Sequence, residues 1–321
     1  MNNFTLSDAR KNGWLARETP VPTAAPHNTK STPPLSDLPL SGTTYFAKDL
    51  FDIKGEATPA GCAALQNQAP AAKDAAIIRQ LNQLGAHLLG TSNMDALAYG
   101  FISNNPLYGL AKNPHDLTRI CGGSSGGSAA LVAAGLADFA LGTDTSGSIR
   151  VPAAFTGIFG IKPTENKLST DGAFPLSPTL DRVGLFAQTP STLRRVFSAL
   201  SPASKPASTT KATAPKLAIL QGYFSRGLEH MVNTAITAFC FKNNIEDAVA
   251  IAGSAQARAA AYLLVAAEAA AVHANGLRAT PALFDPETRA RLLAAQAIPD
   301  AWVAAAKDEQ KRYNAACQEA F

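Results

Sequence analysis

The fold of this chain is decided by residues 121–164, which read CGGSSGGSAALVAAGLADFALGTDTSGSIRVPAAFTGIFGIKPT. Two glycine–serine turns flank a predicted strand here. Gly122–Gly127 form the first turn, because adjacent glycines adopt positive φ and let a ligand approach the main chain closely. Ser128–Ala134 predicts a short helix, Asp138–Leu141 a buried strand, and Gly142–Arg150 the second turn. This layout presents serine hydroxyl and backbone N–H groups to one place, as acyl transfer requires.

The sequence before this stretch has the order helix, strand, loop. Asp74–Leu84 carries apolar residues at helical spacing, and Gly85 ends the helix. Ala86–Leu89 and Thr44–Ala47 predict strands. We therefore expect an α/β fold, with a large twisted mixed sheet, mostly parallel, covered by helices on both faces.

Three further regions have distinct compositions. Residues 1–40 are rich in Pro, Ser and Thr without periodicity, which predicts an N-terminal arm, mobile or loosely docked, ahead of one domain over residues 41–321. Asn93–Asp116 is a long irregular connection, and we expect such a loop to carry substrate determinants. From Ala248 to Phe321 the chain is alanine-rich, and prolines separate its predicted helices.

Composition excludes several classes of protein. A hydrophobic content of 46% over 321 residues suffices for a buried core. The 28 basic and 24 acidic residues include no basic block, so we expect no nucleic-acid partner. The most apolar helix candidate, Ala259–Ala267, spans only nine residues, so we expect no membrane partner. The cysteines form no CxxC pair, which favours reduced thiols in a cytoplasmic protein and no metal site; they are Cys62, Cys121, Cys240 and Cys317.

Three motifs resemble those of the amidase signature family, in the order found there. The G-T-D-x-x-G-S-I-R run is residues 142–150, the G-G-S-S-G-G run is residues 122–127, and the K-D-x-x-D-x-x-G run is residues 48–55. The resemblance implies the amidase signature fold and hydrolysis of amide-like C–N bonds without a cofactor. It also implies a catalytic triad of Lys48, Ser124 and Ser148, with a cis peptide bond before Ser124.

The resemblance further implies how the triad works. Neutral Lys48 draws a proton from Ser124, and Ser124 draws one from Ser148, so we expect hydrogen bonds along that series. The pKa of Lys48 must fall by roughly 3 units, which costs about 4 kcal/mol. The oxyanion hole is formed by backbone N–H groups of Thr145, Ser146 and Gly147, and the supporting residues are Ser125, Thr143, Asp144 and Arg150.

Other interpretations exist for the same residues. Ser148 taken alone is an ordinary turn serine, and Ser124 and Ser125 also suit the N-terminus of the helix that follows them. A Ser-His-Asp triad through His115 and Asp181 is less favoured, because hydrolase order places the His last. Cys121 suits a small buried residue better than a nucleophile.

The run from Asn93 to Phe101 resembles the branch of the family that acts on biuret-type compounds. We therefore expect hydrolysis of a small linear amide or urea-type substrate through an acyl-enzyme, with release of ammonia. One alternative is the glutaminase subunit of a tRNA amidotransferase. Another is a truncated, inactive paralogue that serves as a binding or assembly subunit, because the family's usual C-terminal segment is missing. We expect the loss of that segment to leave the pocket open and the activity weakened. A homodimer or a small accessory subunit is the expected assembly.

Overall fold

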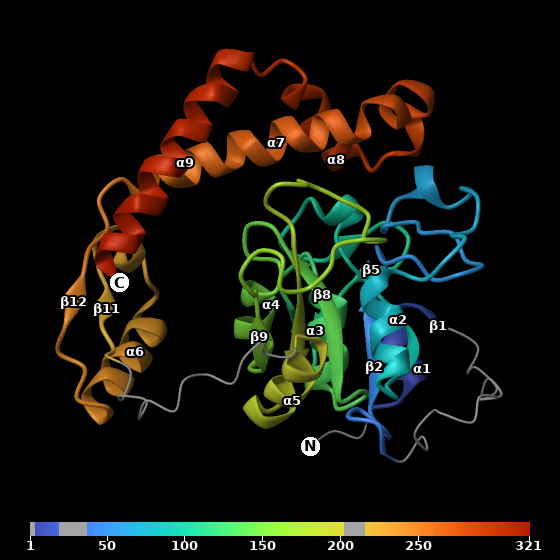
Figure 1. The fold of residues 1–321 in the computed structure, drawn as a ribbon, viewed down its shortest axis with the longest axis horizontal. Helices are drawn as coiled ribbons and strands as arrows, with labels where there is room; N and C mark the ends of the chain where they lie inside the picture. Colours follow the sequence, from blue (N-terminus) through green and yellow to red (C-terminus); the bar gives the residue numbers. More distant parts are fainter. Residues whose placement is uncertain (1–3, 19–36, 202–215) are drawn as a thin grey trace. The chain divides into compact units, whose positions relative to one another are not determined.

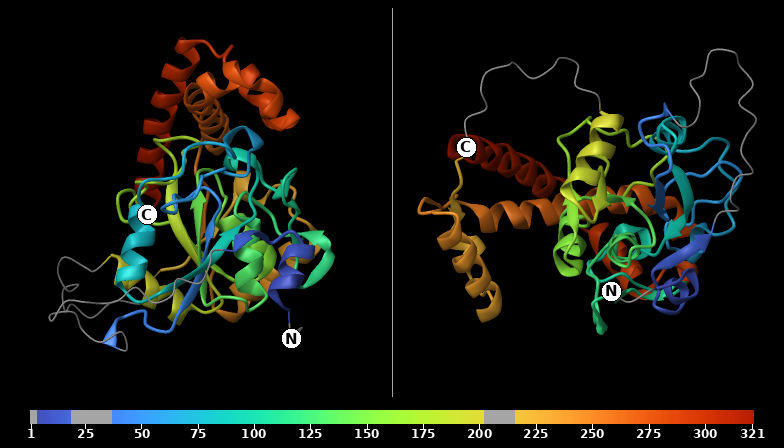
Figure 2. Two further views of the ribbon diagram at one scale, coloured as in Figure 1. Left: turned by 90° about the vertical axis from the view of Figure 1, so that its right-hand side faces the viewer. Right: turned by 90° about the horizontal axis from the view of Figure 1, so that it is seen from below.

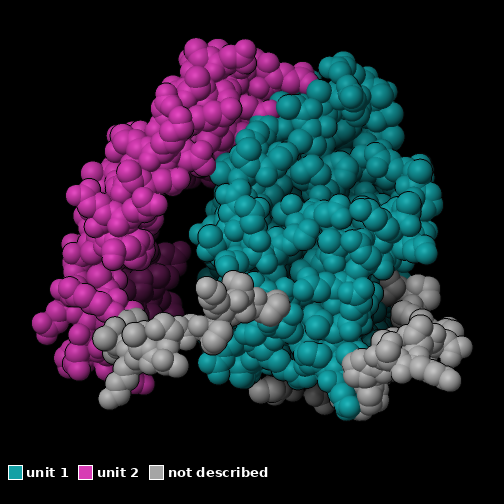
Figure 3. Space-filling view, viewed as in Figure 1, with its two compact units in different colours: residues 1–203, 268–294 teal, residues 204–267, 295–321 magenta. Residues whose placement is uncertain are grey.

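A computed structural model describes residues 4–18, 37–201 and 216–321 (Figure 1). The chain divides into two compact units, coloured separately in Figure 3. Unit 1 comprises Met1–Ala203 and Glu268–Ala294, and unit 2 comprises Ser204–Ala267 and Ala295–Phe321. The range expected to be one domain, residues 41–321, is thus divided between both units.

A six-stranded mixed sheet forms the centre of unit 1. Its strands are, in spatial order, β1 (Leu15–Glu18), β3 (His87–Ser92), β2 (Thr44–Lys48), β8 (Phe139–Asp144), β10 (Arg182–Ala187) and β9 (Phe159–Ile161). The pairs β3–β2 and β2–β8 are parallel, whereas β1, β10 and β9 pair antiparallel with their neighbours. The predicted α/β fold is confirmed, with parallel pairing in the core of the sheet.

Helices cover both faces of this sheet (Figure 2). Side chains alternate along β2, so Phe46 packs in a cluster with α3 while the Tyr45 hydroxyl donates to Asn82 of α2 at 3.2 Å. Tyr45 also stacks on Phe139, with ring centroids 5.1 Å apart. The helices are α1 (Leu6–Lys11), α2 (Ala76–Gln83), α3 (Gly126–Ala133), α4 (Arg150–Thr156) and α5 (Pro190–Leu200).

Residues 4–18, which the sequence placed in an arm, are packed on unit 1 instead. Trp14 is fully buried and donates through Nε1 to the Lys112 carbonyl at 2.5 Å, and Phe4 meets its ring edge-on. Strand β1 then pairs with β3. The average composition of residues 1–40 concealed this anchor, because most of the prolines and threonines of that segment lie in residues 19–36, outside the described residues.

The connection from Asn93 to Asp116 contains short paired strands. β4 (Asn104–Asn105) pairs with β5 (Gly109–Leu110), and β6 (Lys112–Asn113) pairs with β7 (Asp116–Ile120). Short 3-10 helices occupy Ala63–Leu65, Ala96–Ala98, Gly222–Ser225 and Pro281–Leu283.

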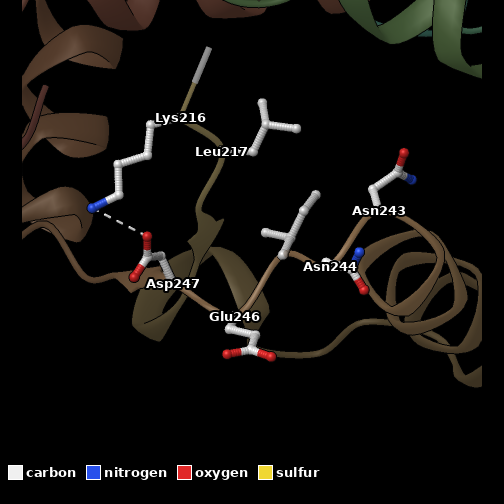
Figure 4. A pocket seen from close by; sticks show the side chains of 7 residues that line it. Lys216, Leu217, Asn243, Asn244, Glu246 and Asp247 are labelled. Atoms are coloured by element: carbon white, nitrogen blue, oxygen red, sulfur yellow. Dashed lines mark ion pairs between the residues drawn. The ribbon is translucent and has the colours of Figure 1, made fainter. Parts of the chain in front are cut away.

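Unit 2 combines a small sheet with helices. β11 (Ile219–Leu220) and β12 (Ala248–Val249) pair in parallel, and α6 (His230–Lys242) connects them. Lys216 and Asp247 form an ion pair at 3.2 Å beside a small cavity (Figure 4). The remaining helices of the chain are α7 (Ser254–Ala279), α8 (Pro286–Ala295) and α9 (Asp300–Ala320), separated at the prolines as predicted.

Helix α7 is much longer than the nine-residue candidate seen in the sequence. Its 26 residues are long and apolar enough to cross a membrane, a property that core helices inside proteins share. Two polar side chains of α7 are engaged within unit 1, because Glu268 accepts hydrogen bonds from Ser177 and His273 stacks on Phe174. The C-terminal half of α7 is therefore packed against protein.

Candidate active site

Lys48 ends the central strand β2 and is fully buried. Its Nζ lies 2.7 Å from Ser124 Oγ and 2.9 Å from Thr143 Oγ1. Burial lowers the pKa of Lys48 to about 7, although the charges of nearby aspartates act in the opposite direction. Lys48 can therefore be neutral and accept a proton near neutral pH, as the resemblance requires.

Ser124 and Ser125 lie in the turn that leads into α3. The peptide bond before Ser124 is cis, as predicted. Ser125 makes no side-chain capping bond to α3, and its hydroxyl instead donates to the Thr143 carbonyl at 3.2 Å. The capping interpretation of Ser125 is therefore wrong, because the β8 backbone offers this buried hydroxyl an acceptor. Ser125 and Thr143 both support the site from adjacent elements.

Ser148 lies in the turn between β8 and α4 and is 4% exposed. Among the described residues, no hydrogen bond joins the Ser148 and Ser124 hydroxyls, so the second link of the predicted series is not formed in the structure. The backbones of the two turns are nevertheless adjacent, since the Ser125 N–H donates to the Ser148 carbonyl at 3.3 Å.

A row of free backbone donors precedes and includes Ser148. Within the described part of the chain, the N–H groups of residues 145–148 donate no hydrogen bond. The two N–H groups that follow, of Ile149 and Arg150, both donate to Asp144 Oδ2. Gly147 has φ 147°, which favours glycine. This is the geometry expected of an oxyanion hole beside Ser148.

Asp144 anchors the turn through charge. Its buried carboxylate pairs with Arg150 at 2.9 Å and with Lys162 at 3.2 Å. Burial opposes ionisation, but the hydrogen bond from Arg150 and the charges of Lys162 and Arg150 outweigh it, so the pKa of Asp144 is far below its usual value. Lys162, which sequence reasoning missed, also donates to the Thr145 carbonyl at 2.8 Å.

Substituting Asp144 tests this anchor. We expect Asp144→Asn to lower the free energy of unfolding by about 2–3 kcal/mol at neutral pH, because it leaves two cations without their partner. The folded pKa is lower than the unfolded one, so this contribution is present above the ordinary carboxyl pKa and is lost as the pH falls below it. Urea unfolding measures it. Asp308→Asn, which alters an ion pair with Lys311 in which both side chains are exposed, serves as the control and should cost under about 0.5 kcal/mol; equal losses would contradict the assignment.

A cavity of about 360 Å³ adjoins these turns. One wall comes from the Asn93–Asp116 connection and the other from α8 and the residue before it. Phe101 belongs to the first wall and also approaches the nucleophile turn, since its ring would lie 3.8 Å from a Cβ on Gly147. Arg291 belongs to the second and donates to the Tyr99 carbonyl at 2.6 Å. The lining residues are Asp95, Ala96, Tyr99, Gly100, Phe101, Ile102, Asn104, Pro106, Asp285, Glu287, Thr288 and Arg291.

A family model described as Amidase matches residues 16–252. The chain belongs to the Amidase family. AtzE, a 1-carboxybiuret hydrolase subunit of Pseudomonas sp. (strain ADP), is 36% identical over 290 residues, which are 86% of this chain and 63% of that protein. One subunit of the glutamyl-tRNA(Gln) amidotransferase of Coxiella burnetii is 39% identical over 61% of this chain and 44% of its own length. This amidase chain thus spans less than two thirds of the length of these relatives.

Solved structures share the fold of this amidase chain. One, from work on a vestigial protein complex and the origins of an s-triazine catabolic enzyme, has a TM-score of 0.80 and 34% identity, covering 88% of this chain and 66% of that one. Another, described as a crystal structure of amidase, has a TM-score of 0.79 and 32% identity, covering 88% and 64%. The amidase signature fold expected from the sequence is confirmed.

Two alternative nucleophile arrangements are not supported by the structure. His115 Nε2 lies 2.9 Å from the Thr156 carbonyl oxygen, whereas Asp181 bonds to Thr145, so the two do not form a triad with a serine. Cys121 is buried and donates through Sγ to the Lys112 carbonyl at 3.0 Å. Burial raises the pKa of Cys121 to about 12, which keeps it a thiol at neutral pH.

Sequence reasoning missed Asp95, which borders the candidate site. Its carboxylate accepts from the N–H groups of Ile102 and Ser103 at 3.2 and 2.9 Å, and its own N–H donates to the Ser124 carbonyl. A Cβ on Gly123 would lie 2.2 Å from Asp95 Oδ2, so only glycine fits there. Burial raises the pKa of Asp95. The available signal was a carboxylate shortly after a predicted strand.

Proposed function

We propose that this chain is an amidohydrolase that cleaves a linear amide or urea-type C–N bond in a small, biuret-like molecule and releases ammonia. The observation that carries the proposal is the buried Lys48 amine, with a pKa near 7, placed 2.7 Å from Ser124 and next to the turn that holds Ser148. A lysine in water is protonated at neutral pH and cannot act as a base.

The proposed reaction proceeds in two steps. Lys48 accepts the proton of Ser124 as Ser124 accepts that of Ser148, and Ser148 Oγ attacks the substrate carbonyl carbon. The C–N bond then breaks, and the proton returns through Ser124 to the leaving nitrogen, giving ammonia and an acyl-enzyme. Water, deprotonated by the same route, attacks the acyl carbon and frees Ser148. Backbone N–H groups of Thr145, Ser146, Gly147 and Ser148 stabilise the oxyanion in both steps.

The substrate class rests on the relatives. A relative named as a 1-carboxybiuret hydrolase subunit matches 86% of this chain. As assembly we propose a homodimer or a small accessory subunit, since a similar solved structure is described as a complex. Cytoplasmic location is proposed because all four cysteines are free thiols.

A substrate panel tests the function. Purified wild-type chain and its Ser148→Ala variant are incubated with biuret, allophanate, glutamine and simple aliphatic amides, and ammonia is measured. Release that is highest with biuret or allophanate and lost in the variant is expected. Preference for glutamine would instead favour the role in a tRNA amidotransferase. If a folded wild-type chain releases no ammonia and does not react with a serine-directed phosphonate, the result would support an inactive paralogue.

A further inference from the structure

Glu268, on α7, is the acceptor for a cluster of three donors from one loop. Its Oε2 accepts from Ser177 Oγ at 2.7 Å and from the Thr179 N–H at 3.1 Å, and its Oε1 accepts from Thr179 Oγ1 at 2.5 Å. The Thr179 N–H can only donate, whereas the two hydroxyls can also accept, and a carboxylate, which only accepts, receives hydrogen bonds from all three groups.

The same loop holds the residue that contacts the nucleophile turn. The N–H groups of Leu176 and Ser177 donate to Asp181 Oδ2 at 2.8 and 3.0 Å, and the Asp181 N–H donates back to the Ser177 carbonyl at 2.8 Å. The other carboxylate oxygen, Asp181 Oδ1, accepts a short hydrogen bond from Thr145 Oγ1. Ser177 is fully buried, so water cannot replace its hydrogen bonds, whereas Thr179 lies at the exposed side of the loop.

Thr145 begins the row of free N–H groups that ends at Ser148. Lys162 fixes the Thr145 carbonyl, which shares a peptide plane with the Ser146 N–H, and Asp181 fixes the Thr145 side chain. A continuous series of hydrogen bonds therefore runs from Glu268 through the 176–181 loop to the first oxyanion donor. Contacts that hold a reacting geometry matter strongly for rate, because a small misplacement costs catalysis without unfolding the protein.

We propose that Glu268 is a positioning residue, which orients the backbone donors beside Ser148 through Ser177, Thr179, Asp181 and Thr145. This inference rests on the proposed function, because it assigns Glu268 to the stabilisation of the transition state in that reaction. Glu268 lies some 120 residues along the chain from the turn it controls and touches neither the triad nor the oxyanion donors in the contacts of the described residues.

The decisive variant is Glu268→Gln, which keeps size and shape but removes the negative charge and one acceptor oxygen, so the charge-assisted hydrogen bonds from Ser177 and Thr179 are weakened or lost. We expect kcat to fall about 10- to 100-fold and KM to change by less than about threefold, because the donors act in the transition state. Arg278→Gln, at an exposed position on the same helix, is the matched control and should leave both constants unchanged. Equal kcat values for wild type and Glu268→Gln would overturn the proposal.

A second substitution separates positioning from general destabilisation. Thr145→Val removes the hydroxyl that Asp181 holds, so it should lower kcat by a similar factor, and adding Glu268→Gln to it should cause little further loss. Multiplicative losses in the double variant would mean that Glu268 acts by another route.

Hydrogen exchange of the 142–149 segment provides a readout without turnover. The segment's amides should exchange faster in Glu268→Gln than in wild type or Arg278→Gln. If the wild-type chain proves inactive but this exchange still increases, the proposed function fails while the positioning contact stands. Unchanged exchange would refute the positioning contact itself.

Discussion

Replacing Ser148 with alanine is expected to lower kcat for ammonia release by at least about 10⁴-fold, because the reaction then has no nucleophile. The free energy of unfolding should change by less than about 0.5 kcal/mol. The reason is that the Ser148 hydroxyl donates no hydrogen bond within the described part of the chain, so its removal leaves no buried partner unsatisfied. Steady-state kinetics and urea unfolding on the same samples measure the two effects.

The control for this variant is Ser191→Ala, which removes an exposed serine hydroxyl on α5. It should keep wild-type kcat and wild-type labelling by a serine-directed phosphonate, while Ser148→Ala should not be labelled. Residual turnover of Ser148→Ala above one hundredth of the wild-type value, taken here as a rough limit, would show that another group attacks the substrate.

Replacing Lys48 with methionine should lower kcat by about 10³-fold or more, because the general base is lost. The pH profile of the wild type should rise through the Lys48 pKa of about 7, since the neutral amine is the active form. This step should be absent from the residual activity of Lys48→Met. Values of kcat/KM measured across the neutral range, which report pKa values of the free enzyme, test both expectations.

Stability should respond to pH through the same amine. The pKa of Lys48 is 10.5 in the unfolded reference and about 7 when folded, so between these values the unfolded chain binds one more proton than the folded chain. The free energy of unfolding therefore rises with pH across this window, by up to about 5 kcal/mol from this group. Lys48→Met should lack this rise. A wild-type profile parallel to that of the variant would show that Lys48 remains charged inside the fold.

The sequence predicted the parts of the site that are local in the chain. Gly147 and the glycines around Ser124 are recognisable because a turn with positive φ, or one approached closely by another chain segment, excludes side chains. The strand periodicity located β2 and β3 within a few residues. The catalytic role of Lys48 was inferred from the family resemblance alone. The residues around a lysine at a strand end do not indicate whether it is buried.

The features that the sequence did not predict depend on contacts between residues far apart in the chain. Glu268 and Ser177 are 91 residues apart, and Trp14 meets Lys112 over 98 residues, so no local pattern reports either contact. The apolar run of β10 suits a buried strand of either direction, and for this reason its antiparallel pairing with β8 could not be read from sequence. The second link of the triad joins side chains of two separate turns, so no local pattern reports whether it forms.

The parallel centre of the sheet has a consequence for how this protein acquires activity. Lys48 meets Ser124 over 76 residues and Thr143 over 95, because β2 lies between β3 and β8. Each contact closes a long loop. The chain loses the entropy of loop closure before the stabilising contacts of the sheet form, and such topologies fold slowly. The base and its partners therefore come together only after the central strands have paired. During refolding, catalytic activity should return after the helical signal and together with the burial of Trp14, so that turnover reports the finished sheet.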